Sequence, residues 1–131
     1  MAVSGGIVER YGKPAGVTMT TSAAVTEGRL VEYTGNQRVA HAAAGSLKVA
    51  GVAAQTCSAA EDQVTVFHEG IFDLEATGAI AVGDYLEAAA NGTVRPLSVV
   101  DVAGSLSPKA IVGKALAAIA NGAKGPVKLL T

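Results

Sequence analysis

The chain has 131 residues, a net charge of −1 and only 4% aromatic residues, although half of its residues are hydrophobic. Its 10 basic and 11 acidic residues are spread singly along the chain, which disfavours electrostatic binding to nucleic acid. The length fits one domain, and no uncharged apolar stretch of about 18 residues is present to span a bilayer.

The hydrophobic residues are mostly Ala and Val, whose small side chains each bury little area. We therefore expect an oligomer to supply additional burial. The first residues lack the charged start and continuous apolar stretch of a signal peptide, which predicts a protein made in a cytoplasm and used without secretion.

Residues 1–20 contain four glycines and one proline, too many for a helix, and predict an extended N-terminal arm, with a single β-rich domain over 21–131. A frayed terminus is the alternative reading. The arm carries sizeable apolar side chains that would be more stable when covered by a contact: Ile7, Val8, Tyr11 and Val17.

Polar and apolar residues alternate from Thr18 onward in stretches of strand length. These stretches are 29–34, 37–42, 49–54, 64–75, 84–88, 93–97, 110–116 and 127–130. Asn36 and Asn91-Gly92 lie between neighbouring stretches and favour tight hairpin turns. The pattern predicts a mainly β protein with a compact β-barrel or β-sandwich architecture, of the β-tulip type.

The chain also contains an internal repeat, in which residues 24–67 align with residues 79–130. The four-residue sequence Ala-Gly-Ser-Leu occurs at 44–47 and again at 103–106, and Gly28 aligns with Gly83. An insertion at 98–102 makes the second half longer and predicts a surface loop. The stretch 64–75 joins the halves, and Gly70 in its middle predicts a bulge or bend between two sheets.

Helix signals are weak. Residues 21–27 could form a short capped turn, and the Ala-rich stretch 115–120 is compatible with a helix or a continued strand. We favour a strand there, because the matching residues 53–58 of the first half are poor helix formers.

No group of residues predicts catalysis, and we expect no catalytic residue, no cofactor and no metal site. Cys57 is the only cysteine, which excludes an intrachain disulfide and favours a small buried side chain. The one polar cluster, His68-Glu69 with Asp73 and Glu75, is more typical of a solvated strand face than of an acid/base or metal site.

The order of several short motifs resembles the small capsid decoration, or cement, proteins of tailed bacteriophages. The motifs are Gly51-Val52-Ala53, the stretch 64–72, Gly83-Asp84-Tyr85-Leu86, Asn91-Gly92-Thr93-Val94 and the stretch 111–116. The resemblance spans residues 17–130 and implies a non-enzymatic β-rich subunit that forms a homotrimer. It further implies binding to the major capsid protein on the exterior of the mature virion head, head stabilisation, and an arm that lies along the shell or a neighbouring subunit.

Two other functions remain open at this point. The chain could be a tail-tube, head-completion or baseplate component of a phage, or a β-barrel module that binds a ligand. The second would use the few aromatic residues available, which are Tyr11, Tyr33, Tyr85, Phe67 and Phe72. For a decoration protein we expect the interface to involve the arm and the insertion, through Ile7, Val8, Tyr11, Val17, Val99, Val100 and Val102.

Overall fold

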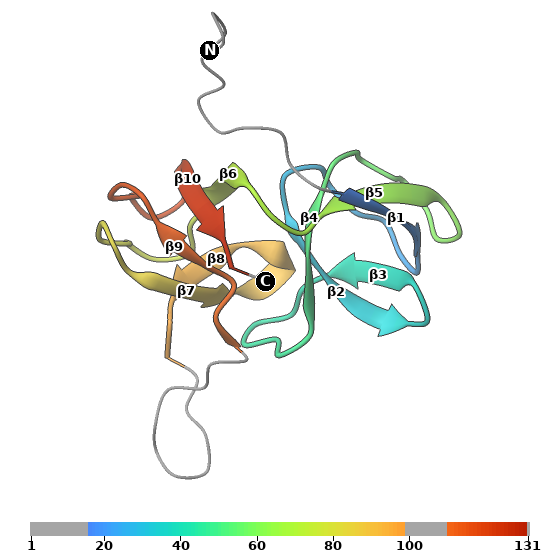
Figure 1. Ribbon diagram of the computed structural model, residues 1–131, viewed down its shortest axis with the longest axis horizontal. Helices are drawn as coiled ribbons and strands as arrows, with labels where there is room; N and C mark the ends of the chain where they lie inside the picture. Colours follow the sequence, from blue (N-terminus) through green and yellow to red (C-terminus); the bar gives the residue numbers. More distant parts are fainter. Residues whose placement is uncertain (1–15, 99–109, 131) are drawn as a thin grey trace, which may run out of the picture.

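The computed structural model describes residues 16–98 and 110–130, and these residues form β-strands with one short 3-10 turn and no α-helix. The first half is a closed five-stranded barrel with strand order β1-β3-β2-β4-β5 (Figure 1). Its strands are β1 (Gly16–Thr21), β2 (Leu30–Gly35), β3 (Arg38–His41), β4 (Val49–Ala53) and β5 (Gln63–Phe67). We call this half the first barrel, and it confirms the predicted β-rich fold.

The second half is a five-stranded sheet with strand order β6-β10-β9-β7-β8, which we call the second sheet. Its elements are β6 (Ile71–Glu75), β7 (Tyr85–Ala88), the 3-10 turn η1 (Ala90–Gly92), β8 (Val94–Pro96), β9 (Gly113–Ala115) and β10 (Lys124–Leu129). A parallel bridge between Ala76 and Val94 links the two ends of this sheet. The bridge takes the place of the parallel pairing of β1 with β3 in the first barrel.

The two halves therefore have the same strand connectivity, which confirms the repeat. Equivalent backbone hydrogen bonds hold equivalent positions: Gly28 N–H donates to the Ala53 carbonyl at 2.9 Å, and Gly83 N–H donates to the Ala115 carbonyl at 2.8 Å. The sequence pattern aligns the closing stretch 64–67 with 127–130, and the structure shifts this alignment by two residues. Val66 lies opposite Ala53 as Val127 lies opposite Ala115, so these two valines are the equivalent positions.

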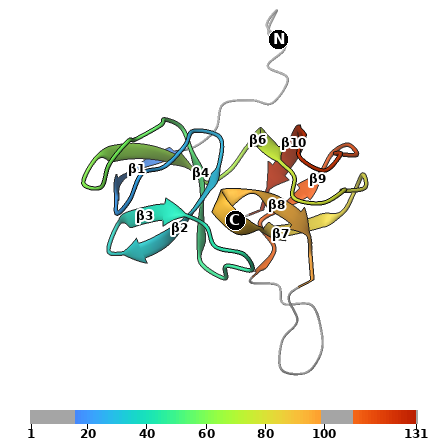
Figure 2. The ribbon, with the colours of Figure 1, turned by 180° about the vertical axis from the view of Figure 1, so that it is seen from behind.

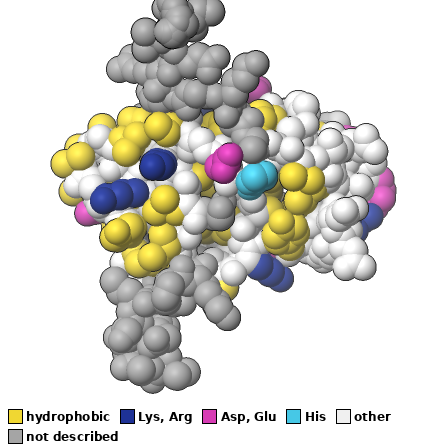
Figure 3. All heavy atoms as spheres, viewed as in Figure 1, with side chains coloured by type: hydrophobic (Ala, Val, Ile, Leu, Met, Phe, Trp, Pro, Cys, Tyr) yellow, Lys and Arg dark blue, Asp and Glu magenta, His cyan; other side chains and the backbone are white. Residues whose placement is uncertain are grey.

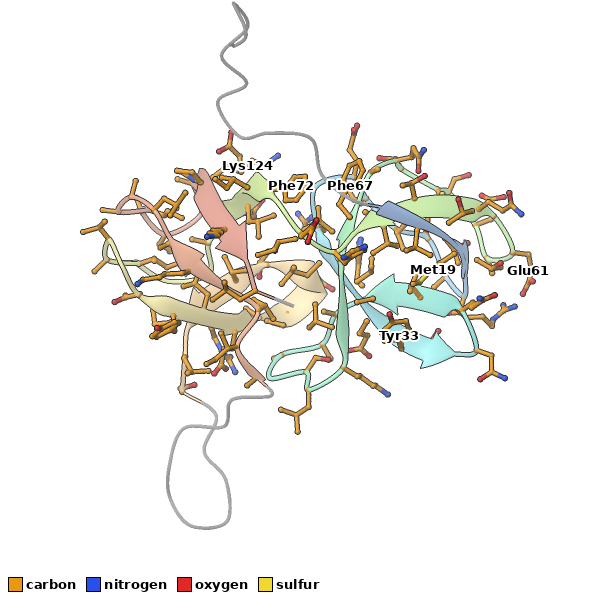
Figure 4. The ribbon with its side chains drawn as sticks, viewed as in Figure 1. Met19, Tyr33, Glu61, Phe67, Phe72 and Lys124 are labelled. Atoms are coloured by element: carbon orange, nitrogen blue, oxygen red, sulfur yellow. The ribbon has the colours of Figure 1, made fainter. Side chains whose placement is uncertain are left out.

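The stretch 64–75 is two strands and not one. β5 ends at Phe67 and β6 begins at Ile71, and Gly70 between them has φ of +119°. The predicted bend at Gly70 is confirmed, because a positive φ turns the backbone out of the first barrel and into the second sheet. Phe67 and Phe72 stack across this bend with ring centroids 5.4 Å apart (Figure 4).

Two expected boundaries are corrected. Residues 16–20, expected in the arm, belong to β1, where Gly16 to Thr20 pair with Phe67 to Gln63 of β5. Their alternating side chains complete the barrel, whereas residues 1–15 lie outside the described part of the chain. Residues 115–120 are neither a long strand nor a helix: β9 ends at Ala115, and Ile119 forms an isolated bridge with Ile80.

Apolar side chains form two clusters. The first fills the first barrel and consists of Met19, Val25, Val31, Val39, Ala50, Ala53, Cys57, Val64 and Val66. The second fills the second sheet and continues across the junction, where it takes in Leu30, Ala42 and Val52 of the first barrel. Leu30 and Val52 alternate with the inward-facing Val31 and Ala53, so they point out of the first barrel and towards the second sheet. Figures 1 and 2 show β4 at this junction from both sides.

No helix among the described residues is long and apolar enough to cross a membrane.

Candidate interaction surface

Because the chain is an internal repeat, each half has an equivalent outer face. This face is covered in the first barrel and exposed in the second sheet. Leu30 and Val52, on the outer side of the first barrel, are 0% and 1% exposed because the second sheet packs on them. The equivalent hydrogen bonds of Gly28 and Gly83 make Tyr85 the counterpart of Leu30 and Lys114 the counterpart of Val52. Both counterparts are exposed. Within residues 16–98 and 110–130, nothing covers this face of the second sheet as it is covered in the first barrel.

One row of side chains crosses this face. Tyr85 of β7 lies opposite Lys114 of β9, Lys114 lies opposite Lys128 of β10, and Lys128 lies opposite Ile71 of β6. Leu116 and Leu130 continue the outward alternation of β9 and β10 and are 42% and 46% exposed. We call this surface the open face and define it as Ile71, Tyr85, Lys114, Leu116, Lys128 and Leu130. Figure 3 shows hydrophobic side chains around basic ones on this half of the molecule.

Lys114 and Lys128 give the open face positive charge. Lys114 Nζ lies 5.4 Å from the centroid of the Tyr85 ring, which is cation–π distance. Within the described residues the ion pairs are Arg29–Glu75, Arg38–Glu61 and Glu87–Arg95, and neither Lys114 nor Lys128 belongs to one. Like charges directly opposite each other on neighbouring strands repel, so the Lys114–Lys128 pair is unfavourable in the isolated chain.

At the edge of the same sheet, Glu87 is a buried carboxylate with a structural role. Its Oε2 accepts hydrogen bonds from Arg95 Nε at 2.7 Å, and its Oε1 accepts one from the Ser98 N–H. Glu32 holds the equivalent place in the first barrel, where its Oε1 accepts a hydrogen bond from the Ala43 N–H at 3.0 Å. Each carboxylate thus fixes the backbone where the chain leaves the hairpin, which gives both residues a structural reason to be glutamate.

The first barrel contains two perturbed electrostatic sites, both away from the open face. Burial, together with the Arg29 charge, lowers the pKa of His41, whose Nε2 accepts a hydrogen bond from Thr26 N–H at 2.8 Å. At the opposite end of the barrel, hydrogen bonds and charge attraction between Arg38 and Glu61 raise the pKa of Arg38 and lower that of Glu61. Both side chains of this second pair face solvent, so the pair is a surface contact.

The interface residues expected from the sequence are mostly untested. Val17 lies on β1 opposite Val66 and is 43% exposed, as a contact residue would be. The other six lie outside the described residues: Ile7, Val8, Tyr11, Val99, Val100 and Val102. Lys114 and Lys128 could not be grouped from the sequence, because their adjacency depends on the pairing of β9 with β10. The alternation in 114–116 and 127–130 indicated only that each lysine faces outward.

Two acidic residues of the polar cluster in the central stretch have different surroundings. Glu75 lies 3.5 Å from Arg29 in an ion pair at the junction of the two halves, and Asp73 is exposed. Within residues 16–98 and 110–130, no three His, Cys, Asp or Glu side chains are placed to hold a metal ion.

Comparison with known proteins agrees with the resemblance seen in the motifs. The family model described as "Phage cement protein" matches residues 10–129. The chain belongs to the phage cement protein family. It is therefore a structural protein of the phage head and a component of the virion.

A solved structure shares the fold of this cement protein. It is described as "The crystal structure of head fiber gp8.5 N base in bacteriophage phi29" and matches with a TM-score of 0.66 and 21% sequence identity. The match covers 89% of this chain and 94% of that chain, so both barrel-like halves have counterparts there. No curated protein sequence matches the cement protein.

Proposed function

We propose that this cement protein binds the outside of the mature phage head as a homotrimer, contacts the major capsid protein and stabilises the shell. The observation that carries the proposal is the family match over residues 10–129. The open face supports it, because it offers exposed apolar and charged side chains of the kind that form protein interfaces.

A cement protein of this kind needs surface and not a reaction centre. If it binds the expanded shell and not its precursor, its binding free energy stabilises the expanded state by mass action. A trimer on a local threefold axis would join three modest contacts, so that avidity makes the assembly strong even though each contact is weak. The Ala- and Val-rich core of each subunit is consistent with a need for added burial between subunits.

The test uses expanded heads of the phage that encodes the chain, prepared without it, and the corresponding unexpanded precursor heads. The purified protein is added to both, and mass spectrometry gives its copy number relative to the major capsid protein. We expect saturation at a near-equal ratio on expanded heads only, and a higher temperature of head disruption after binding. Light scattering of the free protein measures its molar mass and therefore the number of subunits in the oligomer.

Three results would count against the proposal. Absence of binding to expanded heads would overturn it, and equal binding to precursor heads would remove the stabilising mechanism. A few copies per virion, together with a hexameric ring in electron micrographs, would instead indicate a tail-tube, head-completion or baseplate role.

A further inference from the structure

We propose that the open face is the surface through which the cement protein docks on the shell, and that the shell presents carboxylates to Lys114 and Lys128. This inference rests on the proposed function and adds to it the contact surface and the chemistry of the partner. The occupant to which we commit is an acidic patch of the capsid protein and not a second copy of this chain.

The first argument is the row of charges. Lys114 and Lys128 are direct cross-strand partners. Among the described acidic residues at outward positions of the same sheet, Glu75 and Glu87 form ion pairs with Arg29 and Arg95, and Asp73 lies opposite Pro126. Bringing a carboxylate between the two ammonium groups replaces repulsion with attraction, and such charge-assisted bonds are stronger than neutral ones. The folded chain therefore carries an electrostatic arrangement that an acidic partner would improve.

The second argument is the apolar border of the two lysines. Tyr85, Ile71, Leu116 and Leu130 surround them, and Tyr85 is 49% exposed. An exposed aromatic side chain is typical of an interface centre, whereas the lysines supply the charge that a complementary partner would recognise. Such a border would exclude water from the lysine–carboxylate contacts and so strengthen them.

The third argument concerns self-association. In the first barrel, the equivalent face is covered by the turn η1, whose Gly92 allows the backbone to approach Leu30 closely. A second copy of the chain could offer only its β2–β3 turn to this face, because its own η1 already covers its own first barrel. This turn corresponds to η1 in the repeat, and Gln37 occupies the position that corresponds to Gly92. Gln37 shares the positive φ, at +55°, but its side chain occupies the space that close docking needs.

The side chains at the equivalent positions of the two faces also argue against self-association. Val52 and Phe67, which lie in the covered region of the first barrel, are replaced at the equivalent positions of the second sheet by Lys114 and Lys128. Lysines on a sheet surface oppose the packing of another apolar sheet or barrel there, because an unpaired charge is costly to bury. A copy of this chain therefore cannot repeat on the open face the packing that joins its own two halves.

The experiment measures binding to expanded heads made without the cement protein. Lys128→Glu reverses the charge of one lysine, and the double variant Lys114→Gln, Lys128→Gln removes both charges without adding repulsion. The control, Lys48→Glu, makes the same charge reversal at an exposed position on the first barrel. All of these positions are exposed, so thermal unfolding should show folded variants.

We expect Lys128→Glu and the double Gln variant to weaken binding by about tenfold or more, and Lys48→Glu to stay within about twofold of the wild type. The affinity of the wild type should fall as salt increases, and this dependence should be shallower in the double Gln variant. Light scattering should give the same oligomer for all four proteins.

The outcomes separate this inference from the proposed function. If the wild type does not bind expanded heads, the proposed function fails and the inference fails with it. If the wild type binds and the two open-face variants bind equally well, the inference alone is overturned. If these variants bind weakly because they have lost the oligomer, the face joins copies of the chain, and the assignment to the shell is wrong.

Discussion

Gly92 of the second sheet lies against the backbone of Leu30 in the first barrel, so closely that a Cβ atom on Gly92 would come within 2.4 Å of the Leu30 carbonyl oxygen. Gly92 also has φ of +73°, a conformation that costs about 1–2 kcal/mol for a residue with a Cβ. We expect Gly92→Ala to lower the free energy of unfolding by about 2–4 kcal/mol, since steric overlap adds to this conformational cost. Urea denaturation followed by circular dichroism measures the loss.

Gly83 is the matched control, because it has φ of +84° but no atom within 4 Å of a built Cβ. Gly83→Ala should cost only the conformational part, about 1–2 kcal/mol. Equal losses in the two variants would show that the close approach of η1 to the first barrel does not contribute to stability.

Arg95 neutralises the buried carboxylate of Glu87, with Arg95 Nη2 2.7 Å from Glu87 Oε2. Arg95→Met keeps the aliphatic part of the side chain but removes this ion pair and its hydrogen bond. We expect a loss of about 2–3 kcal/mol in the free energy of unfolding, because a charge-assisted hydrogen bond to a buried carboxylate is lost.

The matched control for this prediction is Arg38→Met. It breaks the Arg38–Glu61 pair, in which both groups face solvent, and should leave stability almost unchanged. A loss as large as that of Arg95→Met would contradict the role assigned to burial of Glu87.

Much of the fold could be predicted from the sequence, because its signals are local. Alternation marked the positions of nine of the ten strands in the described residues, with β5 and β6 predicted as one stretch, and the Asn-containing turns marked both hairpins. The repeat was visible because Gly28 and Gly83 hold the same backbone bend in each half. Of the described strands, only β1 was assigned to the arm, since its first residues follow Gly12 and Pro14 and alternate in the sequence only from Thr18.

The candidate surface could not be predicted in the same way, because it depends on long-range pairing. The alternation shows that Lys114 and Lys128 face outward, but only the register of β9 with β10 places them side by side. Likewise, no local pattern tells that Leu30 is covered while its equivalent Tyr85 is exposed. That difference arises from how the two halves pack, which breaks the symmetry of the repeat.

Phe67 and Phe72 stack with an interplanar angle of 9° across the bend that joins the two halves. We expect a double-mutant cycle of Phe67→Leu and Phe72→Leu to give a coupling free energy of about 0.5–1.5 kcal/mol, the usual worth of an aromatic pair beyond burial. Denaturant unfolding of the four proteins measures it. A control cycle that pairs Phe67→Leu with Val127→Ala should show a smaller coupling, and equal coupling would mean that the stack itself adds nothing.

His41 should make the cement protein less stable in acid. Burial and the Arg29 charge lower its pKa in the folded state, so folding favours the neutral imidazole, whose Nε2 accepts the hydrogen bond from Thr26 N–H. The contribution of His41 is therefore fully present above its unfolded pKa of about 6.5 and is lost as the pH falls through the lower folded pKa. Unfolding midpoints between pH 8 and pH 4 should show a shallower acid loss for His41→Gln than for the wild type. An unchanged slope in His41→Gln would assign the acid sensitivity to other groups.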